Sequence, residues 1–452
     1  MSLKVCVLIP EIPHKKTKSP KFMHRSMKYF GLGVIVREIC DKFEIEVPYV
    51  DHTQVHKFDI VLYSIHSVED FYNLVHTVKF KMKRKRKNIW IGGGAGVANL
   101  ELLIAYFDYI VIGRAERLII DLLAAIQYNK VLDSPSVVIT SEYNSSNVYK
   151  IQYADRLYDK SIMNRKETMY GCKYNCFYCR YRFSALPPNK RELDNKTTMP
   201  GNEETFWELE IVDSRSYTTS LDGFTEATRY RVNKRISNQR IIDKLVAVPV
   251  LKHSVNLKVY FIAGYPFEKE IDITEFIETI EKADLKGVNN KTFLRVHVTP
   301  FSAEPNTPMQ WESMNTKINL RNMFKEFQVT NGILFKGKDI QVVMPNLISS
   351  EFTLMKRAIY NRAFASDSHI IDFIMSNPFM KNHNKTHTQK IEYLKSKFDL
   401  EPFIKEYPIG STLSSSNIHS WESHDRIIKM ATQFRANSLK KSPKSVEYAN
   451  RL

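Results

Sequence analysis

The sequence predicts an α/β protein: an N-terminal parallel sheet covered by helices, then a second α/β unit, then a mainly helical C-terminal region. Short β-rich runs alternate with helical patterns over residues 1–128. Glycines follow the β-rich run Ile89–Ile91, as at the carboxyl ends of parallel strands that bind ligands. The length of 452 residues, 43% of them hydrophobic, allows two or three domains with cores of their own.

Residues 1–128 are predicted to form a Rossmann-like domain, because strands and helices of similar length alternate along them. The expected strands are Val5–Ile9, Ile45–Val50, Ile60–Ser64, Ile89–Ile91 and Tyr109–Ile112. The expected helices are Leu32–Phe43, Val68–Val78 after a Ser67 cap, Asn99–Phe107 and Ala115–Ile126.

The rest of the chain divides by composition. Residues 129–165 are polar and irregular and are predicted to be a linker, and residues 166–312 form the second α/β unit. Residues 313–452 are predicted to be mainly helical, with helical patterns at Ile318–Phe327, Phe352–Phe364, Ile370–Met375 and Thr388–Phe398.

The charge balance hints at an anionic partner, since 66 Lys and Arg against 49 Asp and Glu give a net charge of +17. The densest run, Lys79–Lys87, leads into a strand and is expected at the amino-terminal edge of the sheet, away from a cofactor. It is interpreted as a solvated face, with steering of a polyanionic substrate as the alternative. Better candidates for contacting an anionic substrate are Arg229, Arg231, Lys234 and Arg235.

Some protein classes are disfavoured. No apolar run reaches the roughly 18 residues of a membrane span, and the start does not resemble a signal peptide. The five cysteines are too few, and odd in number, for a disulfide framework. We therefore expect a cytoplasmic protein in a reducing compartment.

Three cysteines form a Cys-x3-Cys-x2-Cys pattern at Cys172, Cys176 and Cys179. A loop this short can direct three thiolates at one metal centre, and a four-iron cube held by three cysteines keeps one iron open. The alternatives are a zinc site with a distant histidine, although paired zinc knuckles are missing, and a chance grouping. Cys6 and Cys40 are predicted to be inert core thiols.

This loop resembles the signature of the radical S-adenosylmethionine (radical SAM) superfamily, which follows the first strand of a partial (β/α) barrel. The resemblance implies that Cys172, Cys176 and Cys179 hold a 4Fe–4S cluster whose open iron binds SAM. One electron would then cleave SAM to methionine and a 5′-deoxyadenosyl radical. Tyr178 occupies the position that packs near the adenine in the family, with a core aromatic as the alternative.

Two later motifs extend the resemblance. The stretch Tyr217–Arg235 is similar to the mid-barrel strand and following helix, which implies a cofactor role for Ser220. The stretch Lys258–Glu268 is similar to a strand of the family that ends in Gly-Phe-Pro-Gly-Glu. This similarity implies a cofactor-binding role for Gly264 and Glu268. The family's Gly-Gly-Glu is missing, so Glu208 and Glu210 stand as candidates in its place.

The remaining similarity is to radical SAM enzymes with an N-terminal cobalamin-binding-like domain. It rests on Val296–Trp311 and on Gly92, Gly93 and Gly94 followed by Phe107–Glu116. The three glycines are the implied cofactor site. The Asp-x-His-x-x-Gly motif is absent, so a bound cobalamin is expected to have no histidine on its lower face. A domain without cofactor is the alternative.

The resemblance implies an enzyme that modifies an unactivated C–H position, with methyl transfer if cobalamin is bound. The electron donor would be a flavodoxin or ferredoxin. The substrate stays open between a small molecule, a peptide and a nucleic-acid base modified without cobalamin. A hypothesis of another class is a non-catalytic iron–sulfur binding module.

Overall fold

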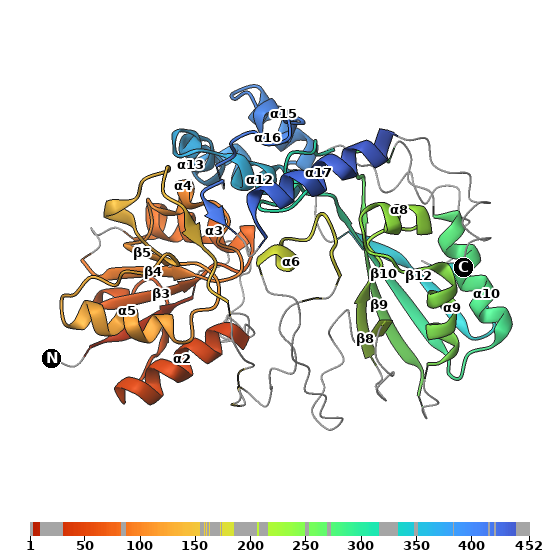
Figure 1. Cartoon of the computed structure of the whole chain (residues 1–452), viewed down its shortest axis with the longest axis horizontal. Helices are drawn as coiled ribbons and strands as arrows, with labels where there is room; N and C mark the ends of the chain where they lie inside the picture. Colours follow the sequence, from red (N-terminus) through yellow and green to blue (C-terminus); the bar gives the residue numbers. More distant parts are fainter. Residues whose placement is uncertain are drawn as a thin grey trace.

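The protein is described here from a computed structural model as two α/β units bridged by helices (Figure 1). The described residues are 3–9, 30–82, 87–153, 158, 160, 162, 172, 174–184, 206–207, 216–248, 253–268, 273–315, 333–347, 351–382, 384–414, 416–419 and 422–439.

The N-terminal sheet has the strand order β2-β1-β3-β4-β5-β6. The strands are β1 (Val5–Leu8), β2 (Tyr49–Val50), β3 (Ile60–Ser64), β4 (Ile89–Gly93), β5 (Tyr109–Val111) and β6 (Val137–Ile139). The first five run parallel, and β6 pairs antiparallel with β5. The segment predicted to be a linker therefore contributes an edge strand, because the apolar run at β6 buries Val137 and Val138.

Helices cover both faces of this sheet, as predicted. They are α2 (Phe30–Phe43), α3 (Val68–His76), α4 (Leu100–Leu103) and α5 (Leu118–Gln127). On one face Val5 and Val7 pack in a cluster with Ile39 of α2 and Leu122 of α5. On the other face, Cys6 packs in a cluster that includes residues of α3 and α4. Alternate residues of β1 thus pack in two hydrophobic cores, one on each face of the sheet, which is typical of a buried parallel strand.

The second sheet has the strand order β11-β12-β10-β9-β8. Its strands are β8 (Ser216–Ser220), β9 (Val255–Ala263), β10 (Thr292–Pro300), β11 (Ile333–Lys336) and β12 (Ile340–Leu347). All pairs are parallel except β11 with β12. The helices α8 (Glu226–Arg231), α9 (Asn238–Val246) and α10 (Thr274–Lys286) lie on one side of it (Figure 1).

This sheet continues past residue 312, where the sequence places the end of the second unit, so the region after 313 is not purely helical. The buried Asp284 carboxylate fixes the start of β12. It accepts hydrogen bonds from the backbone N–H groups of Lys338, Asp339 and Ile340 at 2.7–2.8 Å. The β-rich run Ile340–Leu347 that forms β12 was overlooked because helical patterns dominate the sequence after residue 313.

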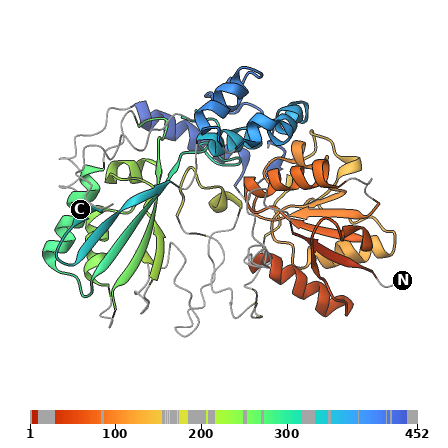
Figure 2. The ribbon, with the colours of Figure 1, turned by 180° about the vertical axis from the view of Figure 1, so that it is seen from behind.

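The C-terminal helices lie across both units (Figure 2). They are α12 (Glu351–Arg362), α13 (Ser368–Ser376), α14 (Pro378–Lys381), α15 (His387–Lys395), α16 (Glu401–Ile404) and α17 (His424–Leu439). The predicted helices starting at Phe352, Ile370 and Thr388 are confirmed, while Ile318–Phe327 lies outside the described residues. A short strand β13 (Ile418–His419) pairs with β7 (Tyr149–Lys150) of the N-terminal half.

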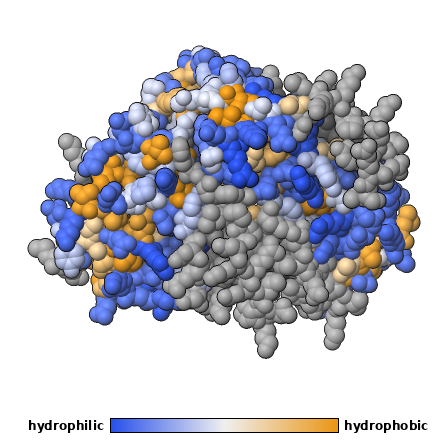
Figure 3. All heavy atoms as spheres, viewed as in Figure 1, coloured by the Kyte–Doolittle hydropathy of each residue, from blue (hydrophilic) through white to orange (hydrophobic). Residues whose placement is uncertain are grey.

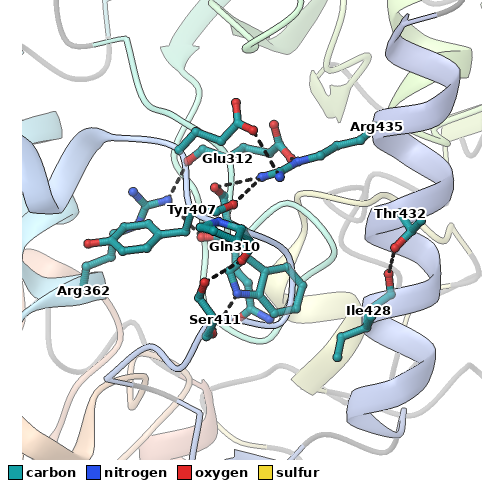
Figure 4. A network of polar contacts seen from close by, with 11 residues as sticks. Gln310, Glu312, Arg362, Tyr407, Ser411, Ile428, Thr432 and Arg435 are labelled. Atoms are coloured by element: carbon teal, nitrogen blue, oxygen red, sulfur yellow. Dashed lines mark hydrogen bonds and ion pairs between the residues drawn. The ribbon is translucent and has the colours of Figure 1, made fainter.

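Two arginines join this helical region to the segment that follows β10 (Figure 4). Arg362 donates to the carbonyl oxygens of Gln310 at 2.9 Å and Glu312 at 2.6 Å, and also to the α16 segment. Arg435 of α17 pairs with the Glu312 carboxylate at 2.7 Å and donates to the Tyr407 carbonyl at 2.9 Å. Guanidinium groups suit this task because each offers five donors in a rigid plane.

On the face shown in Figure 3 the described surface is mainly hydrophilic, with apolar patches on both units. Large apolar side chains that stay exposed include Tyr128 and Val131 after α5 and Leu285 on α10. Isolated apolar residues at the surface are ordinary in globular proteins. Among the described residues, none of the helices combines the length and apolar character that crossing a membrane requires.

Candidate functional site

The cysteine loop packs against the carboxyl ends of the second sheet. Tyr178 of the loop lies beside Tyr265, which follows β9, with ring centroids 5.9 Å apart. Phe177 accepts, through its carbonyl, a hydrogen bond of 3.2 Å from the Met309 N–H beyond β10. This edge is where parallel α/β units position their functional residues.

The three cysteines differ in burial but share one apolar cluster. Cys176 is buried, while Cys172 and Cys179 are half-buried and pack against the same core. The Cys179 N–H donates to the Cys176 carbonyl at 3.2 Å, which forms a tight turn. Burial raises the pKa of the Cys176 thiol, and the nearby Lys234 ammonium opposes that rise.

The three thiols suit an iron–sulfur cluster by their chemistry, since thiolates are its usual protein ligands. Over the described part of the chain, no three His, Cys, Asp or Glu side chains form a group that could hold a metal ion. The cluster assignment therefore rests on the donor chemistry and the shared loop, and it stays a prediction.

The turn after α8 supports the cysteine loop. The Phe177 N–H donates to the Val232 carbonyl at 3.0 Å, and the Asn233 amide donates to the Asn175 carbonyl at 2.8 Å. Asn233 adopts a φ of 62°, a left-handed conformation that asparagine tolerates better than most residues. The motif that resembles the family's helix after the mid-barrel strand thus binds the loop directly.

A buried polar network lies beneath the loop. The Lys234 ammonium is 3.0 Å from the Asp222 carboxylate and donates to the Ser220 hydroxyl at 2.8 Å. Ser220 in turn donates to Asp222 at 2.7 Å. Lys234 also lies over the Tyr174 ring, 4.7 Å from its centroid, and the Tyr265 hydroxyl donates to the Asp222 carbonyl at 2.9 Å. The network thereby connects the ends of β8 and β9 to the cysteine loop.

The contacts in and around this network change the interpretation of three of the four basic residues predicted to contact an anionic substrate. The fourth, Arg235, is exposed and donates to the Asn233 amide oxygen at 2.7 Å. Lys234 is buried and paired within the protein. Arg229 is fully buried and donates to the carbonyls of Ile236, Gly223 and Phe224, so it holds the fold together. Arg231 stacks over the Phe267 ring at 4.1 Å. Asp222 had no local signal in the sequence, because it pairs with Lys234 only through the turn that follows α8.

The predicted cofactor residues of the second unit fall in two groups. Tyr178, Ser220, Gly264 and Glu268 all lie at the carboxyl edge, around Tyr265. A hydrogen bond from Tyr178 lowers the pKa of Cys176, although burial outweighs it. Glu208 and Glu210 lie outside the described residues, directly after Trp207, whose indole N–H donates to the Ser220 carbonyl at 3.1 Å.

Glu268 closes the turn after β9. Its carboxylate accepts from the N–H groups of Gly264 at 2.8 Å and Tyr265 at 3.1 Å, and from the Thr228 hydroxyl at 3.3 Å. Gly264 has a φ of 76°, a conformation that glycine adopts without strain. Burial nevertheless raises the pKa of Glu268 above its usual value, although these three hydrogen bonds lower it.

Glu268→Gln is expected to change how stability depends on pH. A carboxyl whose pKa is raised in the folded state stabilises the fold most below its unfolded pKa, and this contribution is lost as the pH rises through the folded pKa. The free energy of unfolding of Glu268→Gln relative to wild type should therefore increase with pH above the usual glutamate range. Urea unfolding at several pH values measures this, with the exposed Glu278→Gln as charge-matched control. A parallel pH profile for wild type and Glu268→Gln would contradict the prediction.

The three glycines at the carboxyl end of β4, Gly92 and Gly93 within the strand and Gly94 directly after it, are packed against the chain itself. A Cβ at Gly92 would lie 2.7 Å from the Phe107 ring, and one at Gly94 would lie 2.5 Å from the Ile65 carbonyl. Gly93 has more space, with the nearest atom, the Val111 carbonyl oxygen, at 3.4 Å from its Cβ. Close packing against the Phe107 ring accounts for Gly92, and close packing against the loop after β3 accounts for Gly94, while the role of the three glycines in binding a cofactor stays a prediction.

Gly94→Ala is expected to lower the free energy of unfolding by roughly 1–3 kcal/mol, because a side chain at this position is strained. Its φ is 108°, and the clashing atom belongs to backbone that cannot rotate away. Gly31→Ala in helix α2 is the matched control, since no atom lies within 4 Å of its Cβ. That variant should gain about 0.5–1 kcal/mol. Equal stabilities of the two variants in urea would overturn this account.

The next part of the same loop faces the C-terminal helices and the cysteine loop. The Tyr360 hydroxyl of α12 donates to the Gly96 carbonyl at 2.8 Å, and the buried Asn99 amide donates to the Tyr360 carbonyl at 2.8 Å. Arg180, which directly follows Cys179, donates to the Val97 carbonyl. The carboxyl edge of the first sheet therefore touches both α12 and the cysteine loop.

The basic run takes part in a contact between elements. It leads into the amino end of β4, as predicted, and residues 83–86 lie outside the described part. Lys79 forms an ion pair of 2.6 Å with Asp372 of α13 and lies 5.7 Å from the Tyr106 ring centroid. Lys79, the first residue of the run, therefore contacts the C-terminal helices and is also partly exposed to solvent.

A scan against protein-family models and a search of curated proteins each give no match. Among solved structures, the chain is similar to the radical SAM methyltransferase TsrM from Kitasatospora setae, a structure with cobalamin and a 4Fe–4S cluster bound. The identity is 12% and the TM-score 0.34, over 96% of this chain and 100% of that one.

A second likeness is to the cobalamin-dependent SAM radical enzyme OxsB with aqua-cobalamin and SAM bound. Here the identity is 11% and the TM-score 0.34, over 96% of this chain and 62% of that one. Since the TM-scores are this low, the functional argument rests on the residues of this chain.

Proposed function

We propose that the chain is a radical SAM enzyme that holds a 4Fe–4S cluster on Cys172, Cys176 and Cys179. The proposal is supported by a loop that carries three thiols within eight residues and that packs, through Phe177 and Tyr178, against the carboxyl ends of a parallel sheet. When bound, such a cluster passes one electron from a flavodoxin- or ferredoxin-type donor to SAM and breaks its sulfur–C5′ bond, which yields a radical that abstracts hydrogen from a substrate C–H bond.

The residues around the loop have assignable tasks. Lys234 places a positive charge near Cys176 and favours its thiolate form, which is the form that binds metal. The Tyr178 hydrogen bond favours the same form. The aromatic side chains Tyr178, Tyr265 and Phe301 pack side by side and exclude water from this edge. Glu268 holds the turn that carries Tyr265.

The test is anaerobic reconstitution of the full chain with iron and sulfide, followed by SAM and dithionite. We expect brown absorbance and the formation of 5′-deoxyadenosine and methionine, with no product when dithionite is left out. A cluster without 5′-deoxyadenosine, under conditions in which a known radical SAM enzyme turns over, would contradict the proposal and favour a non-catalytic iron–sulfur module.

Cobalamin in the N-terminal unit, and with it methyl transfer, is the finer part of the proposal. It is supported by the hydrogen bond from Arg180, next to Cys179, to the Val97 carbonyl in the loop that continues from Gly94. Absorption spectra of the reconstituted protein, after addition of hydroxocobalamin and removal of the unbound cofactor, test it. If the recovered protein shows no cobalamin absorbance, the cobalamin part of the proposal is wrong, and the proposed enzyme works with the cluster and SAM alone.

A further inference from the structure

The second sheet has one face packed against helices and one face turned away from them. On β9 and β10 buried residues alternate with half-buried or exposed ones along the whole length. The buried set contacts the helices, as shown by Phe261 against Phe276 of α10 with ring centroids 5.0 Å apart. The other set forms the second face, which we call the open face.

Two cations stand next to each other on the open face. Lys258 of β9 and Arg295 of β10 are register partners, and both side chains are exposed. Register partners on adjacent strands lie about 4.8 Å apart, and like charges so placed repel each other. No ion pair involves either residue within the described ranges. Their register partners on the outer strands, Thr218 and Val343, are uncharged.

The next row toward the cysteine loop adds polar and aromatic groups. The Tyr260 and His297 rings are stacked, with centroids 5.0 Å apart and an interplanar angle of 20°. Ser220 is the neighbour of Tyr260 on β8, so the row reaches the Lys234 network. The His297 Nε2 is buried and has no hydrogen-bond partner among the described residues. Burial, Lys258 and Arg295 all lower the pKa of His297, which favours the neutral ring.

Two adjacent cations repel each other, and at these exposed positions water and salt reduce the repulsion, whereas a bound anion would turn it into attraction. Residues that break a local rule, as two like charges side by side do, are expected at functional sites. Phosphate and carboxylate groups match both side chains, because arginine binds them through a planar fork and lysine as a point charge.

We infer that Lys258 and Arg295 bind the anionic group, phosphate or carboxylate, of the substrate, with His297 as the adjacent hydrogen-bonding residue. The inference rests on the proposed function only for the idea that this ligand is the substrate. Lys258 lies five residues before Ala263 at the carboxyl end of β9, or about 17 Å along the strand. The anionic group therefore lies deeper on the open face than the part of the substrate nearest the cysteine loop.

The experiment is calorimetric titration of the full chain with inorganic pyrophosphate and, in a separate arm, with succinate. The wild type should bind one of the two probes, and which one it prefers distinguishes phosphate from carboxylate recognition. The double variant Lys258→Gln/Arg295→Gln should bind at least about tenfold more weakly, since it loses two charge-assisted hydrogen-bonding groups. His297→Phe should weaken binding less.

The matched control is Lys282→Gln/Lys286→Gln, which removes the same charge from exposed positions of α10 behind the sheet. It should bind like wild type. An equal loss in both double variants would mean unspecific attraction to a basic protein and would overturn the inference, as would no binding of either probe by wild type. Circular dichroism verifies that both variants are folded.

The titration needs neither cluster nor SAM, so it fails or succeeds independently of the proposed function. Selective loss of binding in Lys258→Gln/Arg295→Gln, together with no 5′-deoxyadenosine from wild type, would support the anion site and overturn the proposed function. 5′-Deoxyadenosine formation without selective binding would support the proposed function and overturn the anion site.

Discussion

Replacement of Cys172, Cys176 or Cys179 by alanine is expected to abolish both the brown absorbance and the formation of 5′-deoxyadenosine. Each of these thiols supplies one of the three protein ligands in the proposed cluster, and the loop offers no substitute thiol. Iron and sulfide analysis, absorbance after reconstitution, and chromatography of the products measure the loss. Retention of full cluster content by any of the three variants would contradict the ligand assignment.

Cys40→Ala is the matched control, because Cys40 lies half-buried on α2 in the other unit. It should keep the cluster and the activity. The remaining cysteine, Cys6, is fully buried on β1, which confirms the prediction that it is a core thiol. Burial raises the pKa of Cys6 to about 12. Cys6→Ala removes a core side chain and is therefore a poorer control.

Lys234→Met is expected to lower the free energy of unfolding by about 3–5 kcal/mol, the usual cost of leaving a buried charge without its partner. The side chains of Lys234 and Asp222 are only 3% and 8% exposed, so water cannot replace the lost contact. Urea unfolding monitored by circular dichroism measures the change. Lys286→Met on the exposed side of α10 should stay within about 0.5 kcal/mol of wild type.

The double variant Asp222→Asn/Lys234→Met distinguishes the ion pair from the space that the lysine fills. Because it removes both charges, it should be more stable than Lys234→Met alone. A double variant as unstable as the sum of the single variants would show that the two residues act independently. The cysteine loop should also lose order in Lys234→Met, since Tyr174 loses its cation.

The alternation of strands and helices in the first unit was predictable because burial on both faces of a parallel sheet leaves a periodic trace in the sequence. The strand Ile45–Val50 is shorter than predicted, with only Tyr49–Val50 paired, and Glu44 before it adopts a φ of 53°. The edge strand β6 was missed because three residues in a polar segment give too weak a pattern.

The candidate site was predictable as far as its residues are neighbours in the chain. Cys172, Cys176 and Cys179 are recognisable because one loop carries all three. The pairing of Lys234 with Asp222 was not, because it depends on the turn after α8 returning to the end of β8. The burial of Arg229 was also not predictable, because a basic residue in a sequence is expected at the surface.

By itself the sequence determined the α/β class, the thiol loop and the glycines at strand ends, because periodicity and short spacing are local properties. Only the tertiary structure decided which charges are neutralised inside the protein and which stand open. Lys234 meets Asp222, whereas Lys258 meets Arg295, and no local pattern distinguishes these lysines. The physical reason is that tertiary contacts choose the neighbours: the turn after α8 returns Lys234 to Asp222 at the end of β8, and the register of β9 with β10 places Lys258 beside Arg295.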